Sequence, residues 1–228
     1  MVNDLIHLFF PRLCTGCQNA LRSRENTLCL SCCILLPKTH FHKNAQDNPL
    51  ASIFWGRAPV ANAAAYLNFR KHSIVQRLLH ELKYGEHPEL GVFLGTSYGN
   101  DLKAEKAFAE NDLIIPVPLH PKRLKERGYN QSEEFAKGLS QALGIPVDAQ
   151  TLIRNAYQGS QTNLKRYQRW ENVEHVFTVR NNVRVAQKSI LLVDDVLTTG
   201  ATLEACIHPL LQSGAKQISV ACIAAPVY

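Results

Sequence analysis

Apolar residues repeat every three to four positions in two stretches of the chain, which is the spacing of one face of a helix. The first stretch is residues 72–84, where the apolar stripe stops before Gly85. The second is residues 131–143, with Ser132 near its start as a candidate cap and Gly144 directly after it. Both stretches are predicted to be amphipathic helices that pack against a core.

Continuous apolar runs, by contrast, predict buried strands. Residues 113–115 (Leu-Ile-Ile) end at a Pro-Val-Pro loop, and residues 189–193 and 218–225 are longer runs of the same kind. A third helical stripe lies between the last two runs, at residues 203–211, where Pro209 is expected to kink or shorten the helix. Strands that alternate with helices in this way predict an α/β protein with a parallel sheet.

The composition is that of a packed protein rather than a disordered one. Of 228 residues, 46% are hydrophobic and 19% are charged, which is enough for one domain and a small appendage. The apolar runs are much shorter than the roughly 20 residues that span a membrane, and no basic region precedes the first of them as in a signal peptide. We therefore expect a cytoplasmic protein without membrane insertion. The net charge of +6 mildly favours anionic partners.

Five of the seven cysteines lie within the first 33 residues, and four of them form two Cys-x-x-Cys pairs. Cys14 and Cys17 make the first pair, and Cys29 and Cys32 make the second. Two such pairs provide the four thiolates that structural Zn²⁺ prefers, and they leave no open position for catalysis. A set of free or redox-active thiols is the alternative.

Three further residues near these pairs are alternative ligands: Cys33 in place of Cys32, and His40 or His42. A segment of about 45 residues is too small to bury a self-sufficient core. Bound zinc would supply much of the missing stability, since it contributes on the order of 10 kcal/mol in small finger peptides. The metal is therefore expected to be structural.

The chain turns polar at residues 38–48, just before Pro49, and this composition is typical of a linker. We accordingly predict three parts. A zinc-ribbon module occupies residues 1–45, a linker occupies residues 46–58, and a larger domain occupies residues 59–228.

Two adjacent acids, Asp194 and Asp195, end the strand predicted at residues 189–193. The turn after them is rich in Thr and Gly (residues 198–202, Thr-Thr-Gly-Ala-Thr) and opens the next helix. Open parallel sheets bind ligands at the carboxyl ends of their strands, and helix N-termini reached through small residues bind anions. Carboxylates for hydroxyls, and an amide-lined turn for a phosphate, together predict a sugar-phosphate site. A purely structural role would explain one acid, but explains two acids with this turn poorly.

Residues 190–202 resemble the phosphoribosyl-pyrophosphate (PRPP) signature of type I phosphoribosyltransferases. With the cysteine pairs ahead of this signature, the whole chain resembles the ComF/GntX family of bacterial competence-associated proteins. The resemblance implies a type I phosphoribosyltransferase fold, a parallel sheet flanked by helices, behind a small N-terminal zinc-ribbon module. It extends to residues 82–85 (Leu-Lys-Tyr-Gly), residues 117–121 (Val-Pro-Leu-His-Pro) leading to residues 127–131 (Arg-Gly-Tyr-Asn-Gln), and a stretch similar to the family's flexible hood, Gln161 to Leu164 with Arg169 and Asn172.

The resemblance also implies roles for the residues of the signature. The two acids hold the ribose hydroxyls and take part in catalysis, and the turn after them holds the 5-phosphate. In the family reaction a nucleophile displaces pyrophosphate from C1 of PRPP, with Mg²⁺ bound to PRPP. The implied PRPP ligands of this strand and turn are Asp194, Asp195, Val196, Leu197, Thr198, Thr199, Gly200, Ala201 and Thr202.

Cationic side chains that suit the pyrophosphate leaving group gather in a second segment. Four of them crowd into six residues and a fifth precedes Gly85; they are Lys122, Arg123, Lys125, Arg127 and Lys83. Arg127 is the candidate catalytic residue, while Lys83, Lys122 and Arg123 are candidate PRPP ligands. A solvated basic face is the alternative for each of them. His120 is a further candidate, as a proton shuttle.

Two functions from different classes fit these features. The first is a PRPP-dependent transferase of the glycosyltransferase type with an unknown acceptor, linked by the resemblance to DNA uptake and natural transformation. The second is a catalytically silent binding protein that acts with single-stranded DNA and with helicase or recombination-mediator proteins of the uptake machinery. Basic and aromatic residues interleave at residues 122–129 and 154–170, which suits contact with single-stranded DNA as well as with pyrophosphate.

Overall fold

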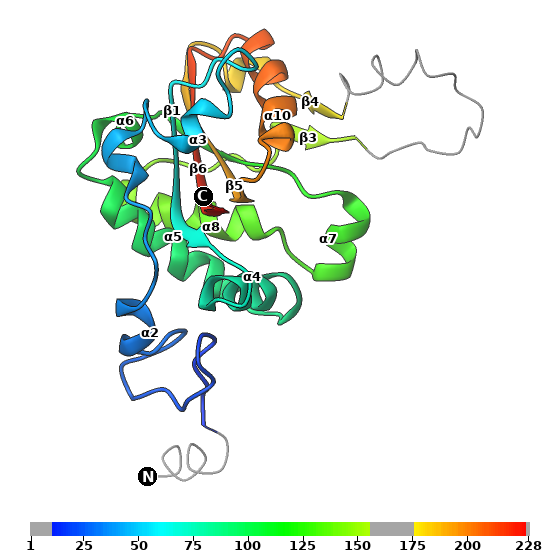
Figure 1. The fold of residues 1–228 in the computed structure, drawn as a ribbon. Helices are drawn as coiled ribbons and strands as arrows, with labels where there is room; N and C mark the ends of the chain where they lie inside the picture. Colours follow the sequence, from blue (N-terminus) through cyan, green and yellow to red (C-terminus); the bar gives the residue numbers. More distant parts are fainter. Residues whose placement is uncertain (1–10, 156–175, 227–228) are drawn as a thin grey trace.

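A four-stranded parallel sheet forms the centre of the protein, which a computed structural model describes at residues 11–155 and 176–226 (Figure 1). The order of the strands across the sheet is β1 (Asn62–Phe69), β6 (Gln217–Pro226), β5 (Ser189–Val196) and β2 (Leu113–Pro116). The predicted α/β fold with a parallel sheet flanked by helices is confirmed. The residues expected to form the hood, from Gln161 to Asn172, lie outside the described residues.

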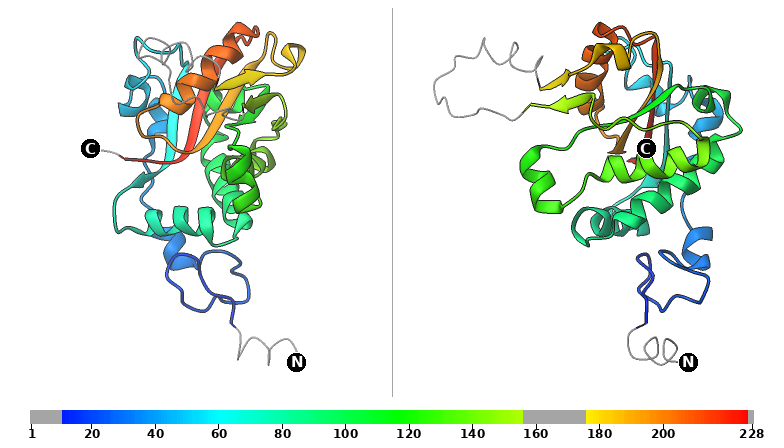
Figure 2. Two further views of the ribbon diagram at one scale, coloured as in Figure 1. Left: turned by 90° about the vertical axis from the view of Figure 1, so that its right-hand side faces the viewer. Right: turned by 180° about the vertical axis from the view of Figure 1, so that it is seen from behind.

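Helices cover both faces of this sheet (Figure 2). One face carries α4 (Ile74–Tyr84), α5 (Pro88–Leu102) and α8 (Gln131–Leu143), and the other carries α3 (Pro49–Ser52) and α10 (Ala201–Gln212). The shorter elements are α2 (Leu30–Ile34), η1 (Phe41–Asn44), α6 (Lys106–Ala109), α7 (Pro121–Arg127), β3 (Leu152–Arg154), β4 (Phe177–Val179) and η2 (Asn182–Arg184).

The register of β5 explains why its first residues are all apolar. β5 lies between β6 and β2, and its residues 190–193 are fully buried because helices cover both faces of the sheet. Ile190 and Leu192 pack into the core beside α10, whereas Leu191 and Val193 pack into the core beside α8. Since all four strands are parallel, the carboxyl ends of β5 and β2 lie at the same edge of the sheet.

The predicted helices form, with two local differences. The cap of α8 is Asn130, whose side chain accepts a hydrogen bond from the backbone N–H of Ser132, so the assignment of the cap to Ser132 was wrong. Gly144 ends this helix with a φ of 75°, as expected. Pro209 lies inside α10 but does not shorten it, because the helix continues to Gln212.

Close packing of glycines joins α5 to α8. A Cβ atom on Gly138 of α8 would lie 2.1 Å from the carbonyl oxygen of Val92, and one on Gly95 of α5 would lie 2.2 Å from the carbonyl oxygen of Phe135. The two backbones approach so closely that only glycine fits at these positions. This contact fixes α8, whose first turn lies at the carboxyl end of β5.

The segment predicted as a linker packs against the domain. Asn48 caps α3 by accepting hydrogen bonds from two backbone N–H groups, and Leu50 and Phe54 are each 1% exposed in the core on the α10 side. Residues 49–58 therefore follow the surface of the sheet rather than extending freely. The division into a module at residues 1–45, a linker and a domain stays a prediction.

The cysteine-rich N-terminal residues pack on α4. Cys14 and Leu28 belong to the same buried cluster as Val75 and Leu78 of this helix, and the Arg77 guanidinium donates to the carbonyl of Gly16. Figure 1 shows this region (blue) below the sheet, next to α4. Among the described residues, no helix is long and apolar enough to cross a membrane.

Candidate functional site

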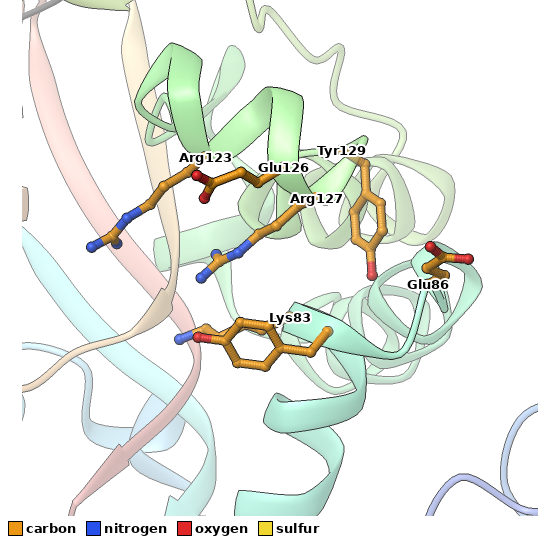
Figure 3. Close-up of a pocket in the computed structure, with 7 residues that line it drawn as sticks. Lys83, Glu86, Arg123, Glu126, Arg127 and Tyr129 are labelled. Atoms are coloured by element: carbon orange, nitrogen blue, oxygen red, sulfur yellow. The ribbon is translucent and has the colours of Figure 1, made fainter.

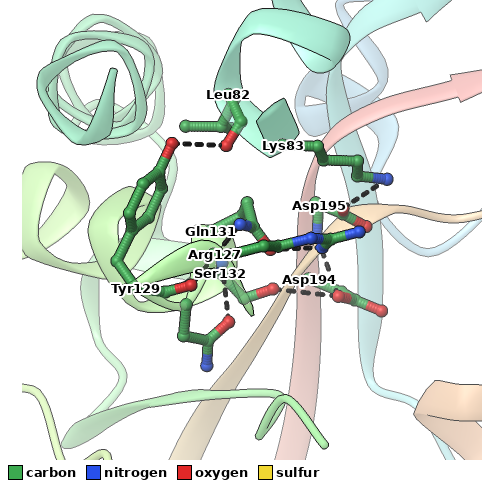
Figure 4. A network of polar contacts seen from close by, with 9 residues as sticks. Leu82, Lys83, Arg127, Tyr129, Gln131, Ser132, Asp194 and Asp195 are labelled. Carbon is green, nitrogen blue, oxygen red and sulfur yellow. Dashed lines mark hydrogen bonds and ion pairs between the residues drawn. The ribbon is translucent and has the colours of Figure 1, made fainter. Parts of the chain in front are cut away.

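The two adjacent acids lie in the last residues of β5, which runs three residues further than the apolar pattern predicted. Asp195 forms an ion pair with Lys83, with 2.6 Å between Oδ2 and Nζ. Asp194 accepts hydrogen bonds at Oδ1 from the Ser132 hydroxyl (3.0 Å) and from the backbone N–H of Asp195 (2.8 Å) (Figure 4). The ends of α4, α8 and β5 thus meet around one pair of carboxylates.

Burial and the neighbouring Asp195 carboxylate raise the pKa of Asp194 to about 7. Its hydrogen bonds from Ser132 and Asp195, and the charge of Lys83, act in the opposite direction but are outweighed. Near neutral pH this carboxyl group therefore exchanges between its neutral and ionised forms. A ligand that donates hydrogen bonds to it would favour the ionised form.

Asp194→Asn is expected to remove a pH dependence of stability. Because folding raises the pKa of Asp194 from 3.8 to about 7, the folded protein binds more protons than the unfolded chain between these values. This contribution to the free energy of unfolding is present below about pH 4 and is lost as pH rises to about 7. In scanning calorimetry without ligand, Asp194→Asn should unfold at a higher temperature than wild type at about pH 8, and at nearly the same temperature at about pH 4. A difference that does not change with pH would contradict this assignment.

A cavity of about 150 Å³ opens in front of the two carboxylates. Four cations line it together with the acids: Lys83, Arg123, Arg127 and Arg154. Of the predicted cations, Lys122 and Lys125 are exposed and are not among the described residues that line this cavity. The structure thus brings together both acids, three of the five predicted leaving-group cations, and Arg154 from the interleaved basic and aromatic residues 154–170.

A second cavity of about 400 Å³ adjoins the first and shares Lys83, Arg123 and Arg127 with it (Figure 3). Arg127 lies over the ring of Tyr84, 5.2 Å from its centroid, and donates to Gln131 Oε1 at 2.8 Å. These contacts hold the guanidinium at the boundary between the two cavities.

The local sequence explains how α7 presents its arginines. His120 caps this helix, since its Nδ1 accepts from the backbone N–H of Lys122, and Gly128 ends it with a φ of 78°. Arg123 and Arg127 are four residues apart and so lie on one face, toward the cavity. His120, predicted as a candidate proton shuttle, therefore has a capping role in this structure.

The turn between β5 and α10 presents free backbone donors. Gly200 has a φ of 76°, which favours glycine, and the exposed residues around it are Thr198, Thr199, Ala201 and Thr202. Within the described chain, no hydrogen bond takes the N–H groups of Thr198, Thr199 or Gly200. The turn and Asp194 enclose a small hollow of about 30 Å³. Free N–H groups at the start of a twelve-residue helix suit a phosphate.

Four cysteine sulfurs form a second candidate site. The sulfurs of Cys14, Cys17, Cys29 and Cys32 all lie within 4.8 Å of one another, and Cys17 and Cys29 are 3.7 Å apart. Tetrahedral zinc with bonds of about 2.3 Å places its sulfurs about 3.8 Å apart, so the group has the size of a zinc site. Burial raises the pKa of Cys14, but hydrogen bonds from backbone N–H groups, chiefly that of Cys29, outweigh it and lower the pKa to about 7.

The alternative ligands do not join this group in the described chain. Cys33 is half-buried and packs against the core next to it, and neither His40 nor His42 belongs to the cluster. His42 is buried, and burial lowers the pKa of its imidazole. The four cysteines can therefore hold a metal such as zinc without help from these residues.

Several residues of the site were not predicted from the sequence. Ser132 was interpreted only as a cap, yet its hydroxyl binds Asp194 across 62 positions of sequence. Asn130 ties α8 to the carbonyl of Val117 at 3.0 Å, a contact that was not predicted. Arg154, by contrast, belongs to the interleaved basic and aromatic residues 154–170 of the sequence analysis, and it lines the cavity from the end of β3. The polar run Asn-Gln-Ser at the start of α8 was the signal available for Asn130 and Ser132, because helix N-termini at strand ends commonly line ligand sites.

Comparison with known proteins agrees with this geometry. Residues 130–226, which include the acids and the turn, match the family model described as a phosphoribosyl transferase domain. The chain is 29% identical over 215 residues to the DNA utilization protein YhgH of Escherichia coli O157:H7, which covers 92% of this chain and 89% of that protein. It is 34% identical over 110 residues to competence protein F of Haemophilus influenzae (48% of each chain) and 25% identical over 206 residues to competence protein ComFC of Streptococcus pneumoniae (90% and 84%).

Proposed function

We propose that this protein, a phosphoribosyltransferase-domain homologue of YhgH and the competence proteins, binds PRPP with Mg²⁺ in front of Asp194 and Asp195. One observation carries the proposal: two carboxylates and four cations line one cavity, and a turn with free N–H groups lines a hollow that shares Asp194 with it. PRPP presents the matching groups, namely ribose hydroxyls, a 5-phosphate and a pyrophosphate.

Each part of the site has a role in this proposal. Asp194 and Asp195 accept hydrogen bonds from the ribose hydroxyls, and Asp195 shares its charge with Lys83. The N–H groups of residues 198–202 donate to the 5-phosphate at the positive end of the α10 dipole. Binding orients the ribose so that its C1 faces the cations of the cavity.

Arg123 and Arg127 bind the pyrophosphate of PRPP. Their planar guanidinium groups donate paired hydrogen bonds to phosphate oxygens, and both line the cavity beside Lys83. The two carboxylates are oxygen donors of the kind that Mg²⁺ prefers, and they would hold it together with oxygens of PRPP. The bound Mg²⁺ would supply charge neutralisation on the departing pyrophosphate.

The reaction class that fits this arrangement is substitution at C1 of the ribose. An acceptor forms a bond to C1 while the bond between C1 and the pyrophosphate oxygen breaks, and pyrophosphate leaves with the electron pair. The chain contributes position and charge: the arginines stabilise the leaving group, and the carboxylates offset positive charge on the ribose ring. The acceptor is the nucleophile that forms this bond to C1.

Calorimetric titration of the protein with PRPP and Mg²⁺ tests the binding. We expect a saturable heat at one site per chain, with an affinity that weakens when Mg²⁺ is chelated because the cations of the cavity alone must then neutralise the pyrophosphate. A wild-type protein that is folded, as shown by circular dichroism, but gives no heat would contradict the proposal.

A second candidate function is binding of single-stranded DNA in DNA uptake, without catalysis. The names of the relatives, DNA utilization and competence proteins, favour it, and so do the exposed cations Lys122 and Lys125 next to the cavity. Release of pyrophosphate from PRPP with pooled nucleobases and amines would support the transferase. Absence of release, together with salt-sensitive binding of single-stranded DNA, would support the uptake role, in which the proposed partners are helicase or recombination-mediator proteins.

We also propose that Zn²⁺ occupies the four-cysteine group as a structural metal. The spacing of its sulfurs supports this, and all four positions of a tetrahedral ion are filled by the chain. Zinc would cross-link the two cysteine pairs and so hold the region that packs on α4.

A further inference from the structure

The turn that is proposed to bind the 5-phosphate rests on the segment ahead of the domain. A Cβ atom on Gly200 would lie 2.8 Å from Cγ2 of Ile53 and 3.1 Å from Cε1 of Phe54. Phe54 is fully buried here, within the core that also contains Leu197 and Leu203. Residues 53–57 therefore form the floor of the turn.

Arg57 connects this floor to the turn by two specific contacts. Its Nη1 donates a hydrogen bond of 2.8 Å to the carbonyl oxygen of Thr199, across 142 positions of sequence. Its Nη2 forms an ion pair with the carboxylate of Glu204 in the first turn of α10. One guanidinium thus spans from the middle of the turn to the helix that follows it.

The contact with Thr199 sets the direction of a peptide group. In a trans peptide the C=O of one residue and the N–H of the next point in opposite directions. Since the Thr199 carbonyl points to Arg57, the N–H of Gly200 points away from residues 53–57. The hollow lined by Asp194 and residues 196–203 includes no described residue of that floor, so this N–H lies on the side where a phosphate would bind.

We propose that Arg57 is a positioning residue that holds the turn in its phosphate-binding conformation. Glu204 anchors the guanidinium, and the guanidinium fixes the Thr199 carbonyl, so that the N–H of Gly200 is aimed before the ligand arrives. A donor fixed in advance costs no reorganisation on binding. This inference rests on the proposed function of the turn. It assigns part of that site to the segment predicted as a linker, residues 46–58.

The test compares three ligands in calorimetric titrations with Mg²⁺: PRPP, ribose 5-phosphate and pyrophosphate. Arg57→Ala is expected to weaken the binding of PRPP and of ribose 5-phosphate by the same factor, and to leave the affinity for pyrophosphate unchanged. The expected factor is about tenfold, because one hydrogen-bond donor to the phosphate, the N–H of Gly200, is no longer held in position. Arg24→Ala, which removes the same charge from an exposed position near the cysteine group, should change none of the three. A purely structural loss would weaken all three ligands together.

A second variant separates positioning from charge. If Arg57 served only to neutralise Glu204, then Arg57→Ala/Glu204→Gln would bind ribose 5-phosphate as tightly as wild type. We expect the double variant to stay at least about fivefold weaker, because the Thr199 carbonyl still lacks its donor. Full recovery, or an Arg57→Ala protein with unchanged affinity for ribose 5-phosphate, would overturn the inference. A wild-type protein that binds none of the three ligands would instead refute the proposed function.

Discussion

Asp194→Asn/Asp195→Asn should bind PRPP at least about a hundredfold more weakly than wild type, in the presence of Mg²⁺. Hydrogen bonds to charged groups contribute roughly 1.5–3 kcal/mol each, so the loss of two carboxylates from the ribose end of the site gives at least this factor. Calorimetric titration measures the effect directly. Undiminished affinity in the double variant would show that the ribose is not held at the end of β5.

For pyrophosphate, we expect the same variant to show no loss of affinity. Lys83 pairs with Asp195 in the free protein, and this ion pair is absent in the variant. The freed ammonium group stays in the cavity with Arg123 and Arg127. Affinity for pyrophosphate, measured without Mg²⁺ because the variant also lacks the proposed Mg²⁺ ligands, should therefore be kept or increased. Asp101→Asn is the matched control, because Asp101 pairs with Lys38 at 2.8 Å in the same manner but does not line either cavity at the site. This control should leave the affinity for both ligands unchanged.

The structure also shows which helices and strands the local hydrophobic pattern can predict. The amphipathic stripes predicted α4 and α8 within two residues, because each has a continuous apolar face and a glycine stop. β1 was missed, since its run of three alanines carries no strand signal, and it is placed by pairing with β6. α5 was missed because its glycines are poor helix formers, and they are tolerated where the helix meets α8.

The candidate site likewise has a part that local sequence predicts and a part that it does not. The acids and the turn are consecutive in sequence, so one motif predicted them. The resemblance of this motif to the PRPP signature also indicated the type of domain. Their partners are not consecutive: Ser132 lies 62 positions from Asp194, and Arg57 lies 142 positions from Thr199. Contacts of this kind follow from the order of strands in the sheet and from α3 packing on the α10 side, neither of which a local pattern contains.

The polar stretch before the domain shows the limit of composition. Residues 38–48 have the polar composition of a linker, yet several of their side chains make specific hydrogen bonds with backbone groups. The amide of Asn48, for example, donates to the carbonyl of Ala63 in β1 at 2.9 Å. Polar residues that satisfy backbone groups at a sheet edge and polar residues in solvent have the same composition, and only the fold distinguishes them.

Cys14→Ser is expected to remove bound zinc and to unfold the N-terminal region. Cys14 is fully buried, and its sulfur accepts the backbone N–H of Cys29 at 3.2 Å while facing the other three sulfurs. Structural zinc contributes on the order of 10 kcal/mol in small finger peptides, which a segment of this size cannot replace by apolar packing. Metal analysis should return one zinc per chain in wild type and almost none in the variant.

Cys33→Ser provides the matched control for the zinc site. It changes the cysteine next to Cys32, but its sulfur lies outside the group of four and it packs against the core instead. This variant should keep one zinc per chain. Cys14→Ser, in addition to losing zinc, should become sensitive to limited proteolysis between residues 11 and 36, because the contact of Gly16 with Arg77 on α4 depends on the same loop. A wild-type protein that is free of metal yet resists proteolysis there would show that the four thiols are held by packing alone.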